Sequence, residues 1–195
     1  KPNWGSKWQA GDVKYKDLTG EGEVTPGAST LENHGDLKRI GNNSPRYRVG
    51  LNLDAAWKGI DFSIFFQGVL KRDWMFDAGD PYFWGAGSGM WQAACFEEHM
   101  DYWTPENTDA YYPKPYFNET KNQQAQDAYM QKASYLRCKN IQLGYTLPTH
   151  ITEKAGISNC RIYLSCDNLF TITGLSSVYD PEVFGSYDGY GTSGK

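Results

Sequence analysis

The sequence predicts an all-β protein, an antiparallel transmembrane β-barrel segment with about four strands and long extracellular loops. Aromatic residues make up 15% of the chain. Mean hydropathy is nevertheless −0.65, a combination typical of strands with one apolar and one polar face. Stretches of strict two-residue alternation recur along the chain, and very long polar connections separate some of them.

The clearest alternation runs from Tyr47 to Trp57. Its odd positions are apolar or aromatic, namely Tyr47, Val49, Leu51, Leu53, Ala55 and Trp57. Its even positions are polar or small, namely Arg48, Gly50, Asn52, Asp54 and Ala56. Because successive side chains of a strand point to opposite faces, one face is expected to be apolar. Aromatic residues at both ends of that face are typical of the interfacial girdles of a membrane barrel.

Three further stretches are expected to be strands. Lys58-Gly59 predicts a tight reversal into a second strand at 60–70, and therefore a hairpin. The third strand is expected at 134–147, and its apolar positions change from even to odd numbers near Asn140. That change predicts a β-bulge or the membrane boundary at this point. The fourth strand is expected at 160–171.

The connections between these stretches alternate in length, as they do in outer-membrane barrels with short periplasmic turns and long extracellular loops. The turns at 58–59 and 148–159 are short, and the second is expected to hold a helical turn at 149–155. The expected organisation is an extracellular loop region at 1–44, a barrel-wall hairpin at 45–70, a long extracellular loop at 71–133, two barrel strands with a short periplasmic turn at 134–171, and an extracellular loop at 172–195 before a missing final strand.

Two alternatives remain open on the pattern alone. A soluble β-sandwich has strands that alternate in the same way, and as a carbohydrate-binding module it would grip glycans through loop tryptophans. A hydrolase would use Glu97, Glu98 and Asp101, but such carboxylates need a set separation across a cleft, which clustering in sequence does not show. Four strands cannot close a barrel, which needs about eight, so the barrel prediction requires the rest of a larger protein.

Several other functions are disfavoured by composition and motifs. The formal charge is −4 and the basic residues are scattered, unlike a nucleic-acid footprint. No run approaches the roughly 18 consecutive apolar residues of a transmembrane helix. The four cysteines have no metal-site spacing, and Cys160 and Cys166 lie about 20 Å apart on one strand, too far to form a disulfide. No phosphate-binding loop, serine-hydrolase or zinc-protease motif occurs, and no cofactor is expected.

Seven short blocks resemble one family when they are taken together and in order. They are Gly-Asp-Val-Lys-Tyr-Lys-Asp-Leu (11–18), Ile-Gly-Asn-Asn-Ser-Pro-Arg-Tyr (40–47), Phe-Phe-Gln-Gly (65–68), Asp-Tyr-Trp-Thr-Pro-Glu-Asn (101–107), Ala-Ser-Tyr-Leu-Arg-Cys-Lys-Asn-Ile-Gln-Leu-Gly-Tyr-Thr-Leu-Pro (133–148), Asp-Asn-Leu-Phe (167–170) and Tyr-Asp-Pro-Glu (179–182). The set resembles the C-terminal part of SusC/RagA-type TonB-dependent transporters. The resemblance implies a large barrel of about 22 strands with a plugged lumen.

The resemblance also implies a function and a set of partners. The complete protein is expected in the Gram-negative outer membrane, in contact with its lipid, and importing glycans or peptides without changing them chemically. A SusD-like lipoprotein is expected to cap the barrel. The TonB complex is expected to act through an N-terminal part that is absent here, and the remaining strands of the same barrel to flank this chain. Nucleic acid is not an expected partner.

Two groups of residues are candidates for binding. The rings of the long loop can stack on sugars or pack against a partner, and the candidates are Trp84, Trp91, Trp103, Tyr111 and Tyr112. The alternative is that these rings pack on one another and give the loop its shape. Asp17, Thr19 and Glu21 occupy the first, third and fifth places of a calcium-loop pattern. The twelfth place is Ala28 instead of a bidentate carboxylate, so a polar turn is the favoured interpretation.

Overall fold

The computed structural model describes residues 2–4, 7–87, 95–117 and 119–183. The described chain forms two compact units. One contains residues 42–74 and 131–183 and holds the β-sheet, and the other contains residues up to 41 together with 75–130. Among the described residues, no helix is both long enough and apolar enough to cross a membrane.

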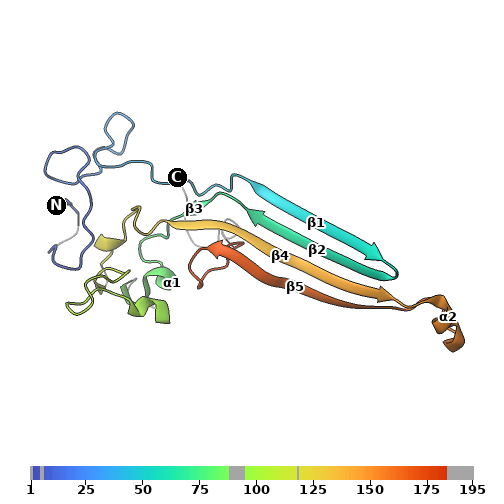
Figure 1. The fold of residues 1–195 in the computed structure, drawn as a ribbon. Helices are drawn as coiled ribbons and strands as arrows, with labels where there is room; N and C mark the ends of the chain where they lie inside the picture. Colours follow the sequence, from blue (N-terminus) through green and yellow to red (C-terminus); the bar gives the residue numbers. More distant parts are fainter. Residues whose placement is uncertain (1, 5–6, 88–94, 118, 184–195) are drawn as a thin grey trace. The chain divides into compact units, whose positions relative to one another are not determined.

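The described strands belong to one antiparallel sheet (Figure 1). They are β1 (Arg48–Trp57), β2 (Ile60–Val69), β3 (Asp73–Trp74), β4 (Gln131–Thr146) and β5 (Arg161–Gly174). β1 pairs with β2, while β2 and β5 pair with opposite edges of β4. The short β3 was not predicted. It pairs with residues 131–132 and extends the sheet beside the first residues of β4. The prediction of an antiparallel barrel segment with four long strands is confirmed.

The turn between β1 and β2 contains only Lys58 and Gly59, because Trp57 pairs directly with Ile60. Both turn residues have positive φ angles, 48° and 88°. Two consecutive positive φ values are characteristic of the type I′ turn, whose twist matches that of two antiparallel strands. Glycine adopts such a conformation at little cost because it has no Cβ. The predicted tight reversal is therefore present. The β4–β5 connection holds the expected helical turn, formed by α2 (Thr149–Thr152) and η4 (Glu153–Ala155).

A β-bulge at Lys139 explains the change of phase along β4. Phe66 pairs with Cys138 but Phe65 pairs with Asn140, so Lys139 has no partner on β2. The register against β5 shifts at the same place. An extra residue reverses the faces of all side chains after it, because the side-chain period of a strand is two. The bulge predicted near Asn140 is thus confirmed.

The registers sort the side chains of the four long strands into two faces. The first, called the apolar face below, contains Val49, Leu51, Leu53, Ala55, Trp57, Ile60, Phe62, Ile64, Phe66, Leu136, Cys138, Ile141, Leu143, Tyr145, Ile162, Leu164, Cys166, Phe170 and Ile172. The opposite one, called the polar face because most of its side chains are polar, contains Arg48, Asn52, Asp54, Asp61, Ser63, Phe65, Gln67, Val69, Tyr135, Arg137, Asn140, Gln142, Thr146, Arg161, Tyr163, Ser165, Asp167, Thr171 and Thr173. Because of the bulge, the apolar residues on both sides of Asn140 share one face.

The apolar face is not covered in the sheet unit. The side chain of Leu164 is 75% exposed and that of Leu51 is 52% exposed. Among the described residues there is one sheet, and no second sheet faces it. A β-sandwich buries the inner faces of two sheets against each other. The described fold therefore does not have the sandwich architecture of the alternative.

The other unit contains short helical segments. They are α1 (Pro81–Trp84), η1 (Gly85–Gly87), η2 (Glu97–Met100) and η3 (Lys121–Gln123). Asp80 starts α1, since its carboxylate accepts hydrogen bonds from the backbone N–H groups of Tyr82 and Phe83. Pro81 occupies the first helical position, where a backbone N–H would have no partner within the helix. Its lack of an N–H therefore costs nothing there. This local start places Phe83 and Trp84 on the buried side of the helix.

Candidate functional site

Polar side chains pair with one another across the polar face. Asp61 of β2 and Arg161 of β5 form an ion pair, in which Arg161 Nε donates to Asp61 Oδ1 over 3.0 Å. Asn140 Nδ2 donates to Asp167 Oδ1 over 2.7 Å and to Ser165 Oγ over 3.2 Å. These contacts join side chains of different strands, so polar groups of this face satisfy one another across the sheet. Such a surface suits a wall that faces water.

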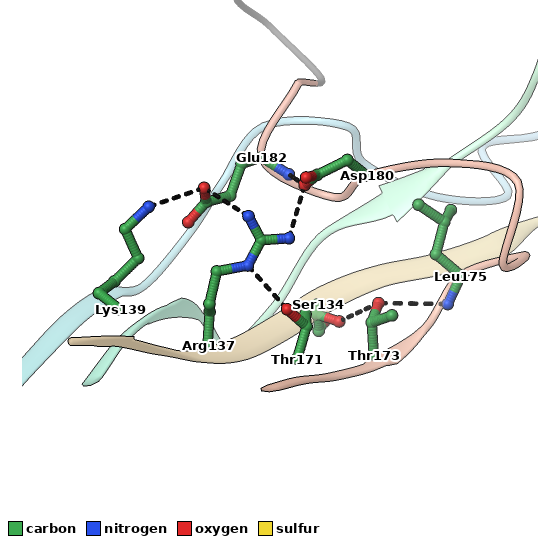
Figure 2. A network of polar contacts seen from close by, with 8 residues as sticks. All are labelled: Ser134, Arg137, Lys139, Thr171, Thr173, Leu175, Asp180 and Glu182. Atoms are coloured by element: carbon green, nitrogen blue, oxygen red, sulfur yellow. Dashed lines mark hydrogen bonds and ion pairs between the residues drawn. The ribbon is translucent and has the colours of Figure 1, made fainter. Parts of the chain in front are cut away.

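Arg137 is the centre of a second polar network on the same face (Figure 2). Its Nη1 donates to Glu182 Oε2 and its Nη2 to Asp180 Oδ1, each over 2.8 Å. Its Nε donates to Thr171 Oγ1 on β5 over 2.7 Å. Lys139 Nζ also reaches Glu182 Oε2, at 3.0 Å. Lys139 is the extra residue of the bulge and has no partner on β2.

Aromatic rings form the core of the loop unit. Phe83 is 1% exposed and stacks on Phe76 with ring centroids 4.5 Å apart. Trp84 packs edge-on against Phe83 at 4.8 Å and against Tyr129 at 5.0 Å. The indole N–H of Trp84 donates to the carbonyl of Asp77 over 2.9 Å, which satisfies its one polar group. Edge-to-face packing of this kind stabilises a core beyond simple burial.

The predicted binding aromatics therefore occupy different positions. Trp84 and Tyr112 are buried in this core, at 6% and 7% exposure. Tyr111 is 45% exposed, and its ring packs edge-on against that of Tyr112. Trp91 lies outside the described residues. The binding role of these rings stays a prediction, but burial shows that Trp84 and Tyr112 also shape the loop.

Trp103 contacts the N-terminal segment at Gly11. Gly11 has a φ of +91°, and a Cβ at this position would collide with the Trp103 indole. Glycine is thus required both by the backbone conformation and by the close approach. The Trp103 backbone N–H donates to the Tyr112 carbonyl over 3.0 Å. Trp103 therefore joins two segments of the loop unit that are far apart in the sequence.

One apolar pocket of about 310 Å³ lies in the loop unit. Trp84, Tyr102, Tyr112, Tyr116 and Met100 contribute to its walls, and Lys114 and Glu119 add charged groups. Pockets that bind small ligands combine apolar walls with a few polar groups in this way. This pocket brings Trp84 and Tyr112 together, whereas Trp103 and Tyr111 are not among its lining residues.

One carboxylate of the hydrolase alternative, Asp101, has a structural role. Asp101 accepts hydrogen bonds from Asn107 Nδ2 and from the Tyr111 backbone N–H, each over 3.1 Å. Both donors lie in the same turn of the loop, so Asp101 fixes its shape. Glu97 lies in the first turn of η2 and is exposed. This arrangement gives Asp101 a role in positioning the backbone.

A buried ion pair that the sequence did not predict joins the N-terminal segment to the loop. Lys121 Nζ lies 3.0 Å from Asp12 Oδ2, and the two side chains are only 1% and 3% exposed. Asn122 Nδ2 donates to Asp12 Oδ1 over 3.1 Å. Burial acts to raise the pKa of Asp12, but hydrogen bonds from Gln9, Asn122 and Lys121 outweigh it and lower the pKa. Only Asp12, within block 11–18, carried a sequence signal.

The calcium-loop candidate forms a polar turn. Asp17 Oδ1 accepts from the Gly20 backbone N–H over 2.5 Å, and Oδ2 accepts from that of Gly22 over 2.7 Å. Thr19 Oγ1 donates to the same carboxylate over 3.3 Å. These hydrogen bonds lower the pKa of Asp17. Converging N–H donors favour a negative charge, so Asp17 holds the turn together, and Glu21 is exposed. Within the described residues, no cluster of three or more His, Cys, Asp or Glu could hold a metal ion.

A single antiparallel sheet with one exposed apolar face and one polar face defines a segment of a β-barrel wall. The relatives of the chain agree with this class. TonB-dependent receptor P3 of Formosa agariphila is 30% identical over 172 residues, which are 88% of this chain and 15% of the relative. TonB-dependent receptor P26 of the same organism is 25% identical over 172 residues, 88% of this chain and 16% of the relative. No family model matches the chain.

Solved structures that resemble the chain belong to the same class of protein. The RagAB peptide transporter aligns with a TM-score of 0.53 and 28% identity over 71% of this chain and 15% of that chain. The open-open state of the RagAB peptide importer aligns with the same TM-score over 72% of this chain. The chain belongs to the SusC/RagA-type TonB-dependent transporters, and it spans about 15% of the length of the first relative. These relatives carry the names of receptors and transporters, which supports a role other than catalysis.

Proposed function

We propose that this chain forms barrel wall and extracellular loops of a TonB-dependent importer in the Gram-negative outer membrane. The observation that carries the proposal is the division of the sheet into two faces. Leu51, Ile64, Leu143 and Leu164 lie on one face in four neighbouring strands, so this face presents a broad apolar surface. Lipid is the natural partner of such a surface, and the polar face then borders the lumen.

In this proposal the long connections lie outside the cell and the turns at 58–59 and 148–159 in the periplasm. Trp57, Ile60, Tyr145 and Ile162 form one row across the four strands at the turn end of the apolar face. Two aromatic rings in that row are typical of an interfacial girdle. The girdle supports the position of the membrane boundary beside these turns.

The cargo is a glycan or a peptide, delivered with the help of a SusD-like surface lipoprotein and driven by the TonB complex. The similarity to the RagAB peptide transporter favours a peptide among the two classes. The pocket of about 310 Å³ in the loop unit is the candidate contact for cargo or lipoprotein. Its aromatic walls suit either the apolar side chains of a peptide or the faces of sugar rings.

The orientation of the sheet can be tested with single cysteines in the complete protein in its native membrane. Leu53 and Asp54 are adjacent on β1 and lie on opposite faces. In a background without other reactive cysteines, Asp54→Cys is expected to react with a water-soluble maleimide and Leu53→Cys with a reagent dissolved in the lipid. The reverse pattern would overturn the orientation. Uptake of defined peptides and oligosaccharides, with and without TonB, then identifies the cargo class.

A further inference from the structure

The segment that follows β5 folds back onto the polar face of the sheet. Residues 175–183, called the strap below, begin with Leu175, which is 7% exposed. The Leu175 backbone N–H donates to Thr173 Oγ1 over 3.2 Å, and that hydroxyl donates to the Ser134 carbonyl over 3.0 Å. These contacts fix the first residue of the strap beside β4 and β5 (Figure 2).

The far end of the strap is held by charge. Asp180 and Glu182 both pair with Arg137, whose side chain is only 10% exposed. Asp180 Oδ1 also accepts from the Glu182 backbone N–H over 2.9 Å, so the two carboxylates face the guanidinium from the same turn. The Arg137 guanidinium uses its Nε, Nη1 and Nη2 atoms in these contacts and in the one to Thr171.

Arg137 is well suited to this task because guanidinium presents a planar fork of donors that matches carboxylates. If it were removed, Asp180 and Glu182 would remain beside each other, and Lys139 would be the one cation among the described residues that forms an ion pair with either of them. Lys139 Nζ lies 3.0 Å from Glu182 Oε2. Repulsion between the carboxylates, together with their return to water, would then favour release of the strap.

We infer that Arg137 is a positioning residue that holds the strap across the polar face. The effect of the strap on the path of the cargo rests on the proposed function. If the polar face borders the lumen, the strap occupies lumen space beside the wall. It then narrows the path of the cargo at the end of the sheet that carries the long connections. Release of the strap would widen that path without any change in the barrel itself.

The test uses the complete protein in its native membrane with a reporter cysteine on the strap. Pro181 lies between Asp180 and Glu182 in the sequence and is buried, so a cysteine at this position is shielded from a water-soluble reagent while the strap is held. Cys95, Cys160 and Cys166 are first replaced by Ala. Cys138, which is 0% exposed, is kept as an internal reporter of sheet integrity. The rate of labelling of Pro181→Cys by a water-soluble maleimide is then measured in each variant.

Arg137→Met is expected to raise the labelling rate of the strap cysteine by about tenfold, since loss of a local anchor shifts the opening equilibrium. The labelling rate in Arg137→Lys is expected to lie between the rates in Arg137→Met and in the parent. Arg161→Met is the matched control, because it removes another arginine of the polar face and is expected to leave strap labelling unchanged. Labelling of Cys138 is expected to stay absent throughout.

Two results would overturn the inference. Equal strap labelling in Arg137→Met and the parent would show that Arg137 does not hold the strap. New reactivity of Cys138 in Arg137→Met would show that Arg137 holds the sheet and not the strap. Failure of the proposed function would be visible separately, as water-soluble labelling of Leu53→Cys in place of Asp54→Cys. The strap result can stand or fall independently of that outcome.

Discussion

Asp61 and Arg161 form an ion pair across the strand that separates them. Asp61 lies on β2 and Arg161 on β5, and both flank Gly144 of β4, since Asp61 pairs with Gly144 in the register and Arg161 with the neighbouring Thr146. A Cβ on Gly144 would lie 2.6 Å from both carboxylate oxygens of Asp61 and from Arg161 Nη2. Glycine thus leaves the space through which the ion pair crosses the central strand.

Gly144→Ala is therefore expected to separate Asp61 from Arg161 and to lower the urea midpoint of the folded complete protein. The loss should be much smaller in an Asp61→Asn background, because there the pair is already weakened. Gly50→Ala is the matched control, since a Cβ at Gly50 would meet the Phe65 ring at an ordinary 3.5 Å. Equal losses of urea midpoint in Gly50→Ala and Gly144→Ala would show that Gly144 is not needed to make space for the ion pair.

The two faces of β1 should respond differently to a charge. Leu51→Arg is expected to cost about 2–4 kcal/mol of folding free energy near the middle of the membrane, while Asn52→Arg should be tolerated. The measurement is the free energy of unfolding from lipid vesicles for each variant. Similar losses at these adjacent positions would mean that the face assignment is wrong.

Deletion of Lys139 should leave the two faces of the sheet unchanged. Cys138 and Asn140 would become neighbours and would still lie on opposite faces, as their partners Phe66 and Phe65 do on β2. We expect the deletion variant to reach the folded outer-membrane fraction without the contact between Lys139 and Glu182. Lys139→Ala keeps the bulge and removes the same contact, so it serves as the control. Loss of the deletion variant alone from that fraction would show that the bulge itself is needed for assembly.

The sheet could be predicted from the sequence because each strand carries its own local signal. The stretch from Tyr47 to Trp57 alternates strictly, and the change of phase near Asn140 indicates a bulge or the membrane boundary, between which the register of β2 and β4 decides. The partners of Arg137 could not be predicted in this way. Asp180 and Glu182 lie in a block with a family resemblance, but their approach to Arg137 depends on the register of β4 and β5 and on the return of the strap.

The loop unit was harder to predict for a different physical reason. A loop has no side-chain period, so nothing in the sequence tells whether a ring such as Trp84 points inward or outward. The pairing of Asp12 with Lys121 joins segments that are distant in the chain and have no regular structure between them. Loop aromatics could therefore be identified as important residues, but their division into core and surface depends on the tertiary fold.

Replacement of Trp84 is expected to lower the stability of the loop unit. Trp84→Ala should cost about 3–5 kcal/mol, as large-to-small changes of buried aromatics do. Phe117 is 71% exposed and provides a matched aromatic control. Phe117→Ala is expected to change stability by less than about 0.5 kcal/mol. Protease resistance of the loop unit in the complete protein measures the difference. If cargo binding fell in Trp84→Ala with no loss of resistance, Trp84 would be a binding residue alone.

The Asp12–Lys121 pair should give the loop unit a defined pH range of stability. The pKa of Asp12 is lowered, so its contribution is present above the ordinary value of about 3.9 and is lost as the pH falls through the lowered value. For Lys121, burial acts to lower the pKa, but the bonds to Asp12 outweigh it and raise the pKa. Its contribution is present below about 10.4 and is lost as the pH rises through the raised value.

Stability of the loop unit should thus be flat between about pH 5 and about pH 9 and fall toward acid, where Asp12 is protonated. Lys121→Met is expected to cost about 3–5 kcal/mol at neutral pH, because it leaves a buried carboxylate unpaired. Asp12→Asn should be less stable at neutral pH and should lose part of the acid dependence. Near-UV circular dichroism of the complete protein during urea unfolding, compared with the parent across this range, measures both effects. An unchanged acid limb in Asp12→Asn would assign the pH dependence to other carboxylates.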